Sequence, residues 1–211
     1  MKLLFEDKVK VNKDAFIAKV REISKKLQIE PDWLMAAMWI ESGIKADAIN
    51  EIGCVGLIQF CPVTYSESWG LTQSYLANLS NVEQLDYVYK YIKAQNKAFH
   101  DGKKIKSYPD LHALIFFPKA IQFKRKQVLE YGTLTAEQVA LKNSAIDLNK
   151  NLEITKKEFE KYAKTKFTSA LSKNEVNRLF QRGIYDQTLQ GIFVLGVIAT
   201  IFGYYIYRQY H

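Results

Sequence analysis

The sequence has few of the residues that build disulfide scaffolds or histidine metal centres. It contains two cysteines in 211 residues, too few for a fold that depends on disulfides. Its three histidines are scattered along the chain, which argues against a histidine-based metal site. Apolar residues make up 48% and charged residues 25%, as in globular proteins, which excludes disorder as a description of the whole chain. The length predicts one ordinary domain with an attachment, or two small domains.

The beginning of the chain lacks the apolar run of a secretion signal. Only Leu3, Leu4 and Phe5 are apolar before Glu6, whereas a signal peptide needs an apolar core of about seven or more residues. We therefore expect no cleaved signal peptide.

Near the other end, the sequence lacks charge. No Asp, Glu, Lys, Arg or His occurs from Gln187 to Tyr207. A helix of this length is roughly 30 Å long, close to the hydrocarbon thickness of a bilayer. Tyr204 and Tyr205 stand where an interfacial aromatic belt is expected. We predict a transmembrane helix over 187–208. The alternative is a buried core helix, which usually carries a polar stripe.

No persistent alternation of apolar and polar residues, the pattern of strands, occurs anywhere in the sequence, so we predict an all-α protein. Helical spacing of apolar residues predicts helices over 14–27, 32–42, 81–99 and 108–117. A polar helical segment, 132–186, would connect this core to the hydrophobic tail.

Glu41 ends a predicted helix that is apolar on nearly every side. Such a helix is buried, so its terminal carboxyl should be desolvated, which raises the pKa and keeps the group protonated near neutral pH. A protonated carboxyl beside a cleft is what general-acid cleavage of a glycosidic bond requires. The simpler interpretation is a glutamate at a helix end that points into water.

The residues around Glu41 resemble the lytic transglycosylases with a lysozyme-like domain. That family has Glu-Ser at the end of a buried helix, a loop of about ten residues, Gly-x-x-Gly-Leu-Met-Gln, and then Pro-x-Thr. Here Glu41-Ser42, the run from Gly53 to Gln59 with Ile in the Met place, and Pro62 to Thr64 keep that spacing. The resemblance covers about residues 28–125. It implies a lysozyme-like transglycosylase domain, which we place at 1–131. The helical linker over 132–186 and the transmembrane helix over 187–208, both predicted from composition, would follow it.

The next family motif, Ala-x-x-Tyr-Asn-x-Gly, is only partly present. Ala113 is followed by Phe116 and Phe117 in the Tyr and Asn places. Phe116 can stack on a sugar but lacks the hydroxyl, which puts one hydrogen bond to substrate or to Glu41 in doubt.

The resemblance also implies the reaction. Glu41 would protonate the glycosidic oxygen between N-acetylmuramic acid and N-acetylglucosamine in peptidoglycan. It would then act as a base while the muramoyl C6 hydroxyl attacks C1 and closes a 1,6-anhydro ring, with no cofactor required. The implied substrate-binding residues are Ser42, Gly56, Gln59, Phe60 and Phe116.

Two other functions stay open at this point. A catalytically inactive glycan-binding protein that attaches to a membrane is favoured by Phe116-Phe117. A lysozyme-type hydrolase would need a second carboxylate in the cleft, for which Asp47 and Glu51 are nearest in sequence.

Residues 147–158 have the spacing of an EF-hand loop, with oxygen-bearing side chains at loop positions 1, 3, 5, 9 and 12. Position 6, where the sharp turn favours glycine, is Leu152. The pattern predicts either a weak calcium site or a loop that keeps the helix–loop–helix shape without metal. The candidate ligands are Asp147, Asn149, Asn151, Glu153 and Glu158.

Negative charge is the scarcer sign, since 30 Lys and Arg face 22 Asp and Glu, a net charge of +8. This balance favours anionic surroundings such as a membrane surface or an acidic cell wall, and no motif indicates a specific nucleic acid. The basic stretch 150–182 would attract anionic lipid beside the predicted span. Cys54 and Cys61 flank the Gly-Leu-Ile-Gln segment and are either a disulfide or two free thiols.

These features conflict in topology. With basic residues before the span, the positive-inside rule would leave the domain in the cytoplasm, where a wall enzyme has no substrate. A virion with an internal membrane resolves the conflict, because it can hold the tail in its bilayer and deliver the enzyme to the wall during entry. We therefore expect a membrane-anchored bacteriophage virion protein, whose partners are peptidoglycan glycan strands, the lipid bilayer and other virion proteins.

Overall fold

The computed structural model describes residues 1–130, 132 and 134–181. These residues form helices and loops with a few isolated β-bridges and no strand, which confirms the all-α class for the part described. Contacts group Met1–Ala170 into one compact unit, and a second unit begins at Leu171. The boundaries expected at 131 and 186 stay predictions.

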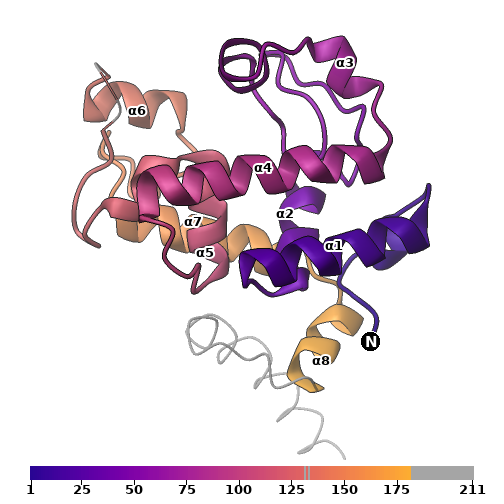
Figure 1. Cartoon of the computed structure of the whole chain (residues 1–211). Coiled ribbons are helices and arrows are strands. Elements are labelled where there is room, and N and C mark those ends of the chain that lie inside the picture. Colours follow the sequence, from indigo (N-terminus) through magenta and orange to yellow (C-terminus); the bar gives the residue numbers. More distant parts are fainter. Residues whose placement is uncertain (131, 133, 182–211) are drawn as a thin grey trace, which may run out of the picture. The chain divides into compact units, whose positions relative to one another are not determined.

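Seven α-helices of the described residues lie in the first unit (Figure 1). They are α1 (Lys13–Leu27), α2 (Pro31–Ser42), α3 (Gln73–Ala77), α4 (Asn81–His100), α5 (Tyr108–Phe116), α6 (Ala136–Lys142) and α7 (Lys156–Ala170). Three shorter helical turns are η1 (Glu6–Lys8), the π-helical η2 (Val63–Ser68) and η3 (Pro118–Gln122). The second unit contains α8 (Lys173–Gln181). The four predicted helices are confirmed as α1, α2, α4 and α5, whereas α3 and η2 were not expected.

The bounds of α2 follow from its sequence. Pro31 stands in the first turn, where its missing N–H is no loss. Gly43 ends the helix with a φ of 65°, a left-handed conformation that favours glycine. Between them, Leu34, Met35 and Met38 are fully buried. The helix therefore runs through the core and brings Glu41 to its end.

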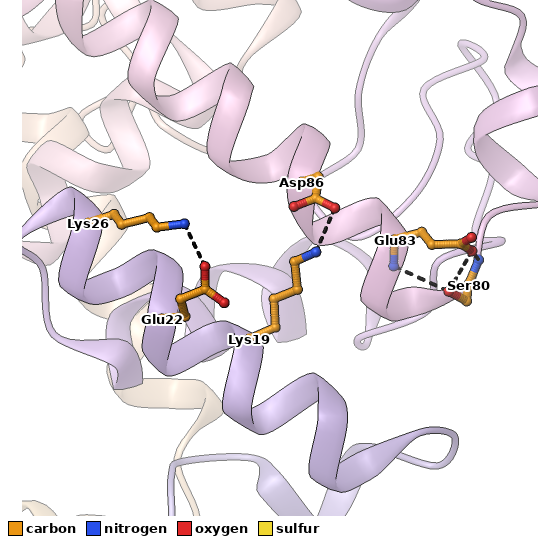
Figure 2. Close-up of polar contacts among 6 residues, drawn as sticks. All are labelled: Lys19, Glu22, Lys26, Ser80, Glu83 and Asp86. Atoms are coloured by element: carbon orange, nitrogen blue, oxygen red, sulfur yellow. Dashed lines mark hydrogen bonds and ion pairs between the residues drawn. The ribbon is translucent and has the colours of Figure 1, made fainter.

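Helix α4 crosses the first unit, with α1 packed along one side and the segment 44–79 on the other (Figure 1). Its first turn is fixed by a capping box between Ser80 and Glu83. Figure 2 shows the polar contacts at this edge, where Lys19 of α1 pairs with Asp86 of α4 at 2.5 Å. Leu85, the residue before Asp86 in sequence, is fully buried in the core.

Helix α7 packs against α5 and α2, so the polar region after 131 shares its core with the first half of the chain. Phe159 of α7 is fully buried in a cluster with Ala113, Leu129 and Ile146. The EF-hand-like loop at the start of α7 is therefore part of the same compact unit as Glu41.

The predicted transmembrane helix, 187–208, lies outside the described residues. Within 1–130, 132 and 134–181, no helix has the length and apolar character needed to cross a membrane.

Candidate active site

Glu41 occupies the last turn of α2 with its side chain largely buried. Burial raises the pKa of this carboxyl to about 7, and the nearby positive charge of Lys166 on α7 opposes the rise. This agrees with the expectation from the apolar helix. At neutral pH, Glu41 is therefore about half protonated and can either donate or accept a proton.

The Glu41 charge acts on Tyr108 of α5, and Lys166 of α7 acts on both Glu41 and His112 of α5. Burial, with the Glu41 charge as the second cause, raises the pKa of Tyr108 well above its ordinary value. Burial lowers the pKa of His112 to about 4, with Lys166 adding to the effect. His112 is therefore neutral, and neither ring nitrogen has a hydrogen-bond partner within the part of the chain that the structure describes. Glu41 is thus the group in this cluster that can exchange a proton near pH 7.

Ser42 joins the end of α2 to the following loop. Its hydroxyl lies 3.0 Å from the carbonyl oxygens of both Met38 and Leu57, and it accepts the backbone N–H of Lys45. The role that the structure gives Ser42 is therefore to hold the loop against the helix that carries Glu41. Its predicted contact with substrate stays a prediction.

Gln84 on α4 fixes the same loop from the other side, and the sequence analysis missed it. Its Oε1 accepts the Leu57 N–H at 2.6 Å, and its Nε2 donates to the carbonyl oxygens of Ala46 and Leu76 at 2.9 Å each. Gly56 allows this approach, because a Cβ there would lie 2.3 Å from the Gln84 Oε1. The one sequence signal was a glutamine at a position that helical spacing places beside Leu85 and Val88, on the apolar face of α4.

A cavity of about 420 Å³ brings together Gln59, Phe60 and Phe116, three of the predicted substrate-binding residues. The Gln59 side chain donates to the carbonyl oxygens of Ala48 and Gly56, so the loop itself holds its amide. Phe116 is 43% exposed, which leaves its ring available to a ligand. Ile58 and Ile115 also line this cavity, but Glu41 does not.

An aromatic cluster extends from this cavity along α4, and it too was missed. Tyr91 lines the cavity and lies edge-on to Phe60, with ring centroids 5.9 Å apart. Trp69 contacts Phe60 at 5.4 Å and Tyr87 at 5.4 Å, and Lys90 lies over its ring. Phe60 itself is almost fully buried, whereas Trp69, Tyr87 and Tyr91 are half-buried rings on which a sugar ring can stack. No repeat or motif in the sequence indicated that residues 60, 69, 87 and 91 would meet.

The structure joins Cys54 and Cys61 in a disulfide, one of the two alternatives left open by the sequence. The bond closes the loop that contains Gly56 and Gln59. It therefore constrains the segment that carries part of the predicted substrate site.

The two spare carboxylates lie elsewhere in the loop. Asp47 lines a separate cavity of about 640 Å³ together with Trp39 and Lys45, and Glu51 is exposed. Neither is among the residues that line the cavity of Gln59 and Phe116. Glu41 lines neither of these two cavities, so neither cavity joins Asp47 or Glu51 to it.

Metal-binding clusters of three or more His, Cys, Asp or Glu side chains do not occur in the part of the chain that the structure describes. The EF-hand-like loop differs from such clusters, because its candidate ligands include asparagine and backbone oxygens.

Comparison with known proteins places one family on this site. Residues 19–108 match the family described as Transglycosylase SLT domain. The match begins within α1, includes Glu41, Ser42, Gly56, Gln59 and Phe60, and ends at the first residue of α5. It therefore stops before Phe116. Neither a search of curated proteins nor one of solved structures found a match to the chain.

Proposed function

We propose that this protein is a peptidoglycan lytic transglycosylase in which Glu41 is the catalytic acid and base. The observation that carries the proposal is a buried carboxyl with a pKa near 7, at the end of α2, inside the segment that matches the transglycosylase domain. A carboxyl with this pKa is suited to donate a proton and then to accept one at neutral pH.

In the proposed reaction, Glu41 gives its proton to the glycosidic oxygen as the bond to C1 of N-acetylmuramic acid breaks. The Glu41 carboxylate then takes the proton of the C6 hydroxyl, whose oxygen bonds to C1 and closes the 1,6-anhydro ring. Glu41 ends the cycle protonated, so no water is consumed.

Product analysis tests the proposal. Full-length protein is incubated with purified sacculi, and the muropeptides are examined by mass spectrometry. We expect 1,6-anhydro products, each lighter by one water than the matching lysozyme product. Hydrated reducing ends would instead show hydrolysis.

The matched variants are Glu41→Gln and, as a control with the same loss of charge, Glu51→Gln. Loss of a general acid typically reduces the rate about 10²- to 10⁴-fold, so Glu41→Gln should cut little or nothing while still binding glycan. Glu51 is exposed, and its variant should cut like the wild type. Equal activity of wild type and Glu41→Gln would refute the site.

A second function, glycan binding without cleavage, is favoured by one observation. Phe116 is exposed at the cavity but has no hydroxyl to bond to substrate or to Glu41. If the wild type binds sacculi and releases no product, this function is the correct one. Phe116→Tyr is then the first variant in which to look for cleavage.

We further propose that residues 187–208 anchor the protein in a membrane, and that it belongs to a bacteriophage virion that opens the wall during entry. The support is the uncharged run from Gln187 to Tyr207 and the topology argument given above. Full-length protein should partition into detergent, while a chain ending at residue 186 should stay in the aqueous phase. Aqueous partition of the full-length protein would contradict the anchor.

A further inference from the structure

The loop between α6 and α7 has the backbone of a cation-binding loop although it lacks the usual glycine. Lys150 and Leu152, at loop positions 4 and 6, have φ values of 59° and 63°. Asp147 accepts the backbone N–H groups of Asn151 and Leu152 at 3.2 and 2.9 Å. The leucine at position 6 therefore does not prevent the sharp turn, which removes the main sequence argument against metal binding.

The observation that indicates a ligand is a buried carboxylate oxygen of Glu158, at loop position 12, that accepts no hydrogen bond in the described part of the chain. Glu158 is only 9% exposed. Its Oε2 accepts from the backbone and hydroxyl of Thr155 at 2.9 and 2.8 Å, which turns the carboxylate toward loop position 9. Its Oε1 is buried and has no hydrogen-bond partner in the described part of the chain. A buried carboxylate oxygen without a partner is costly, and a cation in the loop would satisfy it.

The back of the loop is held in place independently of any metal. The Leu129 N–H donates to the Ile154 carbonyl at 2.7 Å, and the Lys156 N–H donates to the Gln127 carbonyl at 2.9 Å. The loop is therefore preformed between α6 and α7, and binding would need little further ordering of the chain.

Glu158, at loop position 12, is also linked through ring packing to the cavity that Phe116 lines. Phe159, the residue after Glu158, is fully buried, and its ring lies 5.6 Å from His112 and 6.3 Å from Phe116. His112 stacks on Phe116 with ring centroids 5.6 Å apart. A ligand that fixes Glu158 therefore acts one residue away from a ring that supports the exposed Phe116.

We propose that the 147–158 loop binds one calcium ion, and that the bound ion steadies the cleft wall at Phe116 through Phe159. The ligands would be side-chain oxygens of Asp147, Asn149, Asn151 and Glu158 with the Glu153 carbonyl, a hard oxygen set of the kind calcium prefers. Only two of these side chains are charged, and the loop also contains three lysines, Lys150, Lys156 and Lys157. Binding in the millimolar range follows, as in other calcium modules with few charged ligands.

The test is the melting temperature of the full-length protein in mild detergent, first stripped of metal with a chelator. Calcium at about 10 mM should raise the melting temperature by about 2–5 °C, given a millimolar site in a chain of this size. The same concentration of magnesium should raise it less, because magnesium demands a tighter octahedral site. No shift with calcium, or an equal shift with magnesium, would overturn the calcium site.

Two variants with the same change of charge sharpen the test. Glu158→Gln should abolish the calcium shift, while Glu137→Gln, at an exposed position of α6, should keep it. An equal shift in both variants would overturn the assignment of Glu158. If Glu158→Gln does not fold, calorimetric titration of the wild type decides: saturable binding of one ion supports the site, and its absence overturns it.

Amide hydrogen exchange tests whether calcium binding also steadies the segment that contains Phe116. Calcium should slow amide exchange at 156–163 and at 113–117 and leave α1 unchanged. Slowing at 156–163 alone would refute the link to the cleft wall. The significance of Phe116 for substrate binding rests on the proposed function. The melting and hydrogen-exchange measurements use no substrate, so their outcome does not depend on whether the protein cleaves peptidoglycan.

Discussion

The helical frame and the loop at 44–62 are stabilised by different interactions. In the frame, made of α1, α2, α4 and α5, apolar side chains such as Phe16, Met35 and Leu85 are fully buried against one another. The loop also buries apolar side chains, such as Val55, Leu57 and Phe60, but two short antiparallel bridges and a disulfide add to that packing. Polar side chains from within the loop and from outside it supply further contacts. The frame places Glu41, whereas the loop places Gln59, so one site depends on both kinds of interaction.

Gln59 and Asn50 bond within the loop, and further polar contacts come from residues distant in sequence. Gln84 reaches Leu57 and Ala46, and Gln73 donates to the Gly53 carbonyl at 2.9 Å. A buried polar side chain whose partners are all backbone groups cannot be replaced by an apolar one without leaving those groups unpaired. The loop should therefore be more sensitive to polar substitutions than the frame.

The largest effect that would test this comparison is expected at Gln84. Gln84→Met keeps the volume but removes the partner of the buried Leu57 N–H and the Gln84 bonds to the Ala46 and Leu76 carbonyls, of which Leu76 keeps its bond from the Leu79 N–H. We expect the free energy of unfolding to fall by about 2–4 kcal/mol, and chemical denaturation measures it.

The matched control is the adjacent Leu85→Ala, which removes packing from the frame at a similar cost of about 2–5 kcal/mol. Under conditions where both variants remain folded, only Gln84→Met should weaken glycan binding, because only it releases the loop. Unchanged binding by folded Gln84→Met would show that the loop does not need this contact.

The same contrast separates what could be predicted from sequence. Helical spacing, Pro31 and the apolar run before Glu41 are local, and they correctly predicted α2 and the buried carboxyl. The bond from Gln84 to Leu57 joins residues 27 apart in sequence, and nothing local indicates it. The packing of α7 on α2 and α5 is equally remote. Sequence therefore predicted the buried carboxyl of Glu41 and its raised pKa, but not the neighbours that act on it.

A smaller effect is expected from the disulfide. Replacing Cys54 and Cys61 together by serine releases a short loop, which should lower the free energy of unfolding by about 2 kcal/mol. The melting temperature of the wild type should fall similarly in a reducing agent, whereas that of the double variant should not respond. A double variant as stable as the oxidised wild type would show that the polar contacts alone hold the loop.

A still smaller effect on the free energy of unfolding is expected at Glu41, whose buried carboxylate destabilises the fold at high pH. Its pKa is near 7 in the folded chain and about 4.5 when unfolded, so folding favours the protonated form. The stability of the wild type should therefore fall as pH rises from about 4.5 to 7, whereas Glu41→Gln has no such loss. After allowance for its partial exposure, the variant should be about 1–2 kcal/mol more stable than the wild type at pH 8 and about equal at pH 4.

Thermal unfolding of both chains across this pH range makes the comparison. The lowered pKa of His112 acts in the opposite direction, because its protonation destabilises the fold as pH falls below about 6.5. Since His112 is present in both chains, its contribution cancels in the difference. A difference that does not change with pH would mean that the Glu41 carboxyl is solvated, which would also weaken its assignment as the general acid.

The smallest effect is expected on the outside of the frame, at the ion pair of Lys19 and Asp86 in Figure 2. The Asp86 side chain is 65% exposed, so solvent screens the attraction despite the 2.5 Å contact. A double-mutant cycle with Lys19→Ala and Asp86→Ala should give a coupling of no more than about 0.5 kcal/mol, and less in high salt. A coupling as large as the effect of Gln84→Met would break the comparison, because it would mean that polar contacts also hold α1 on α4.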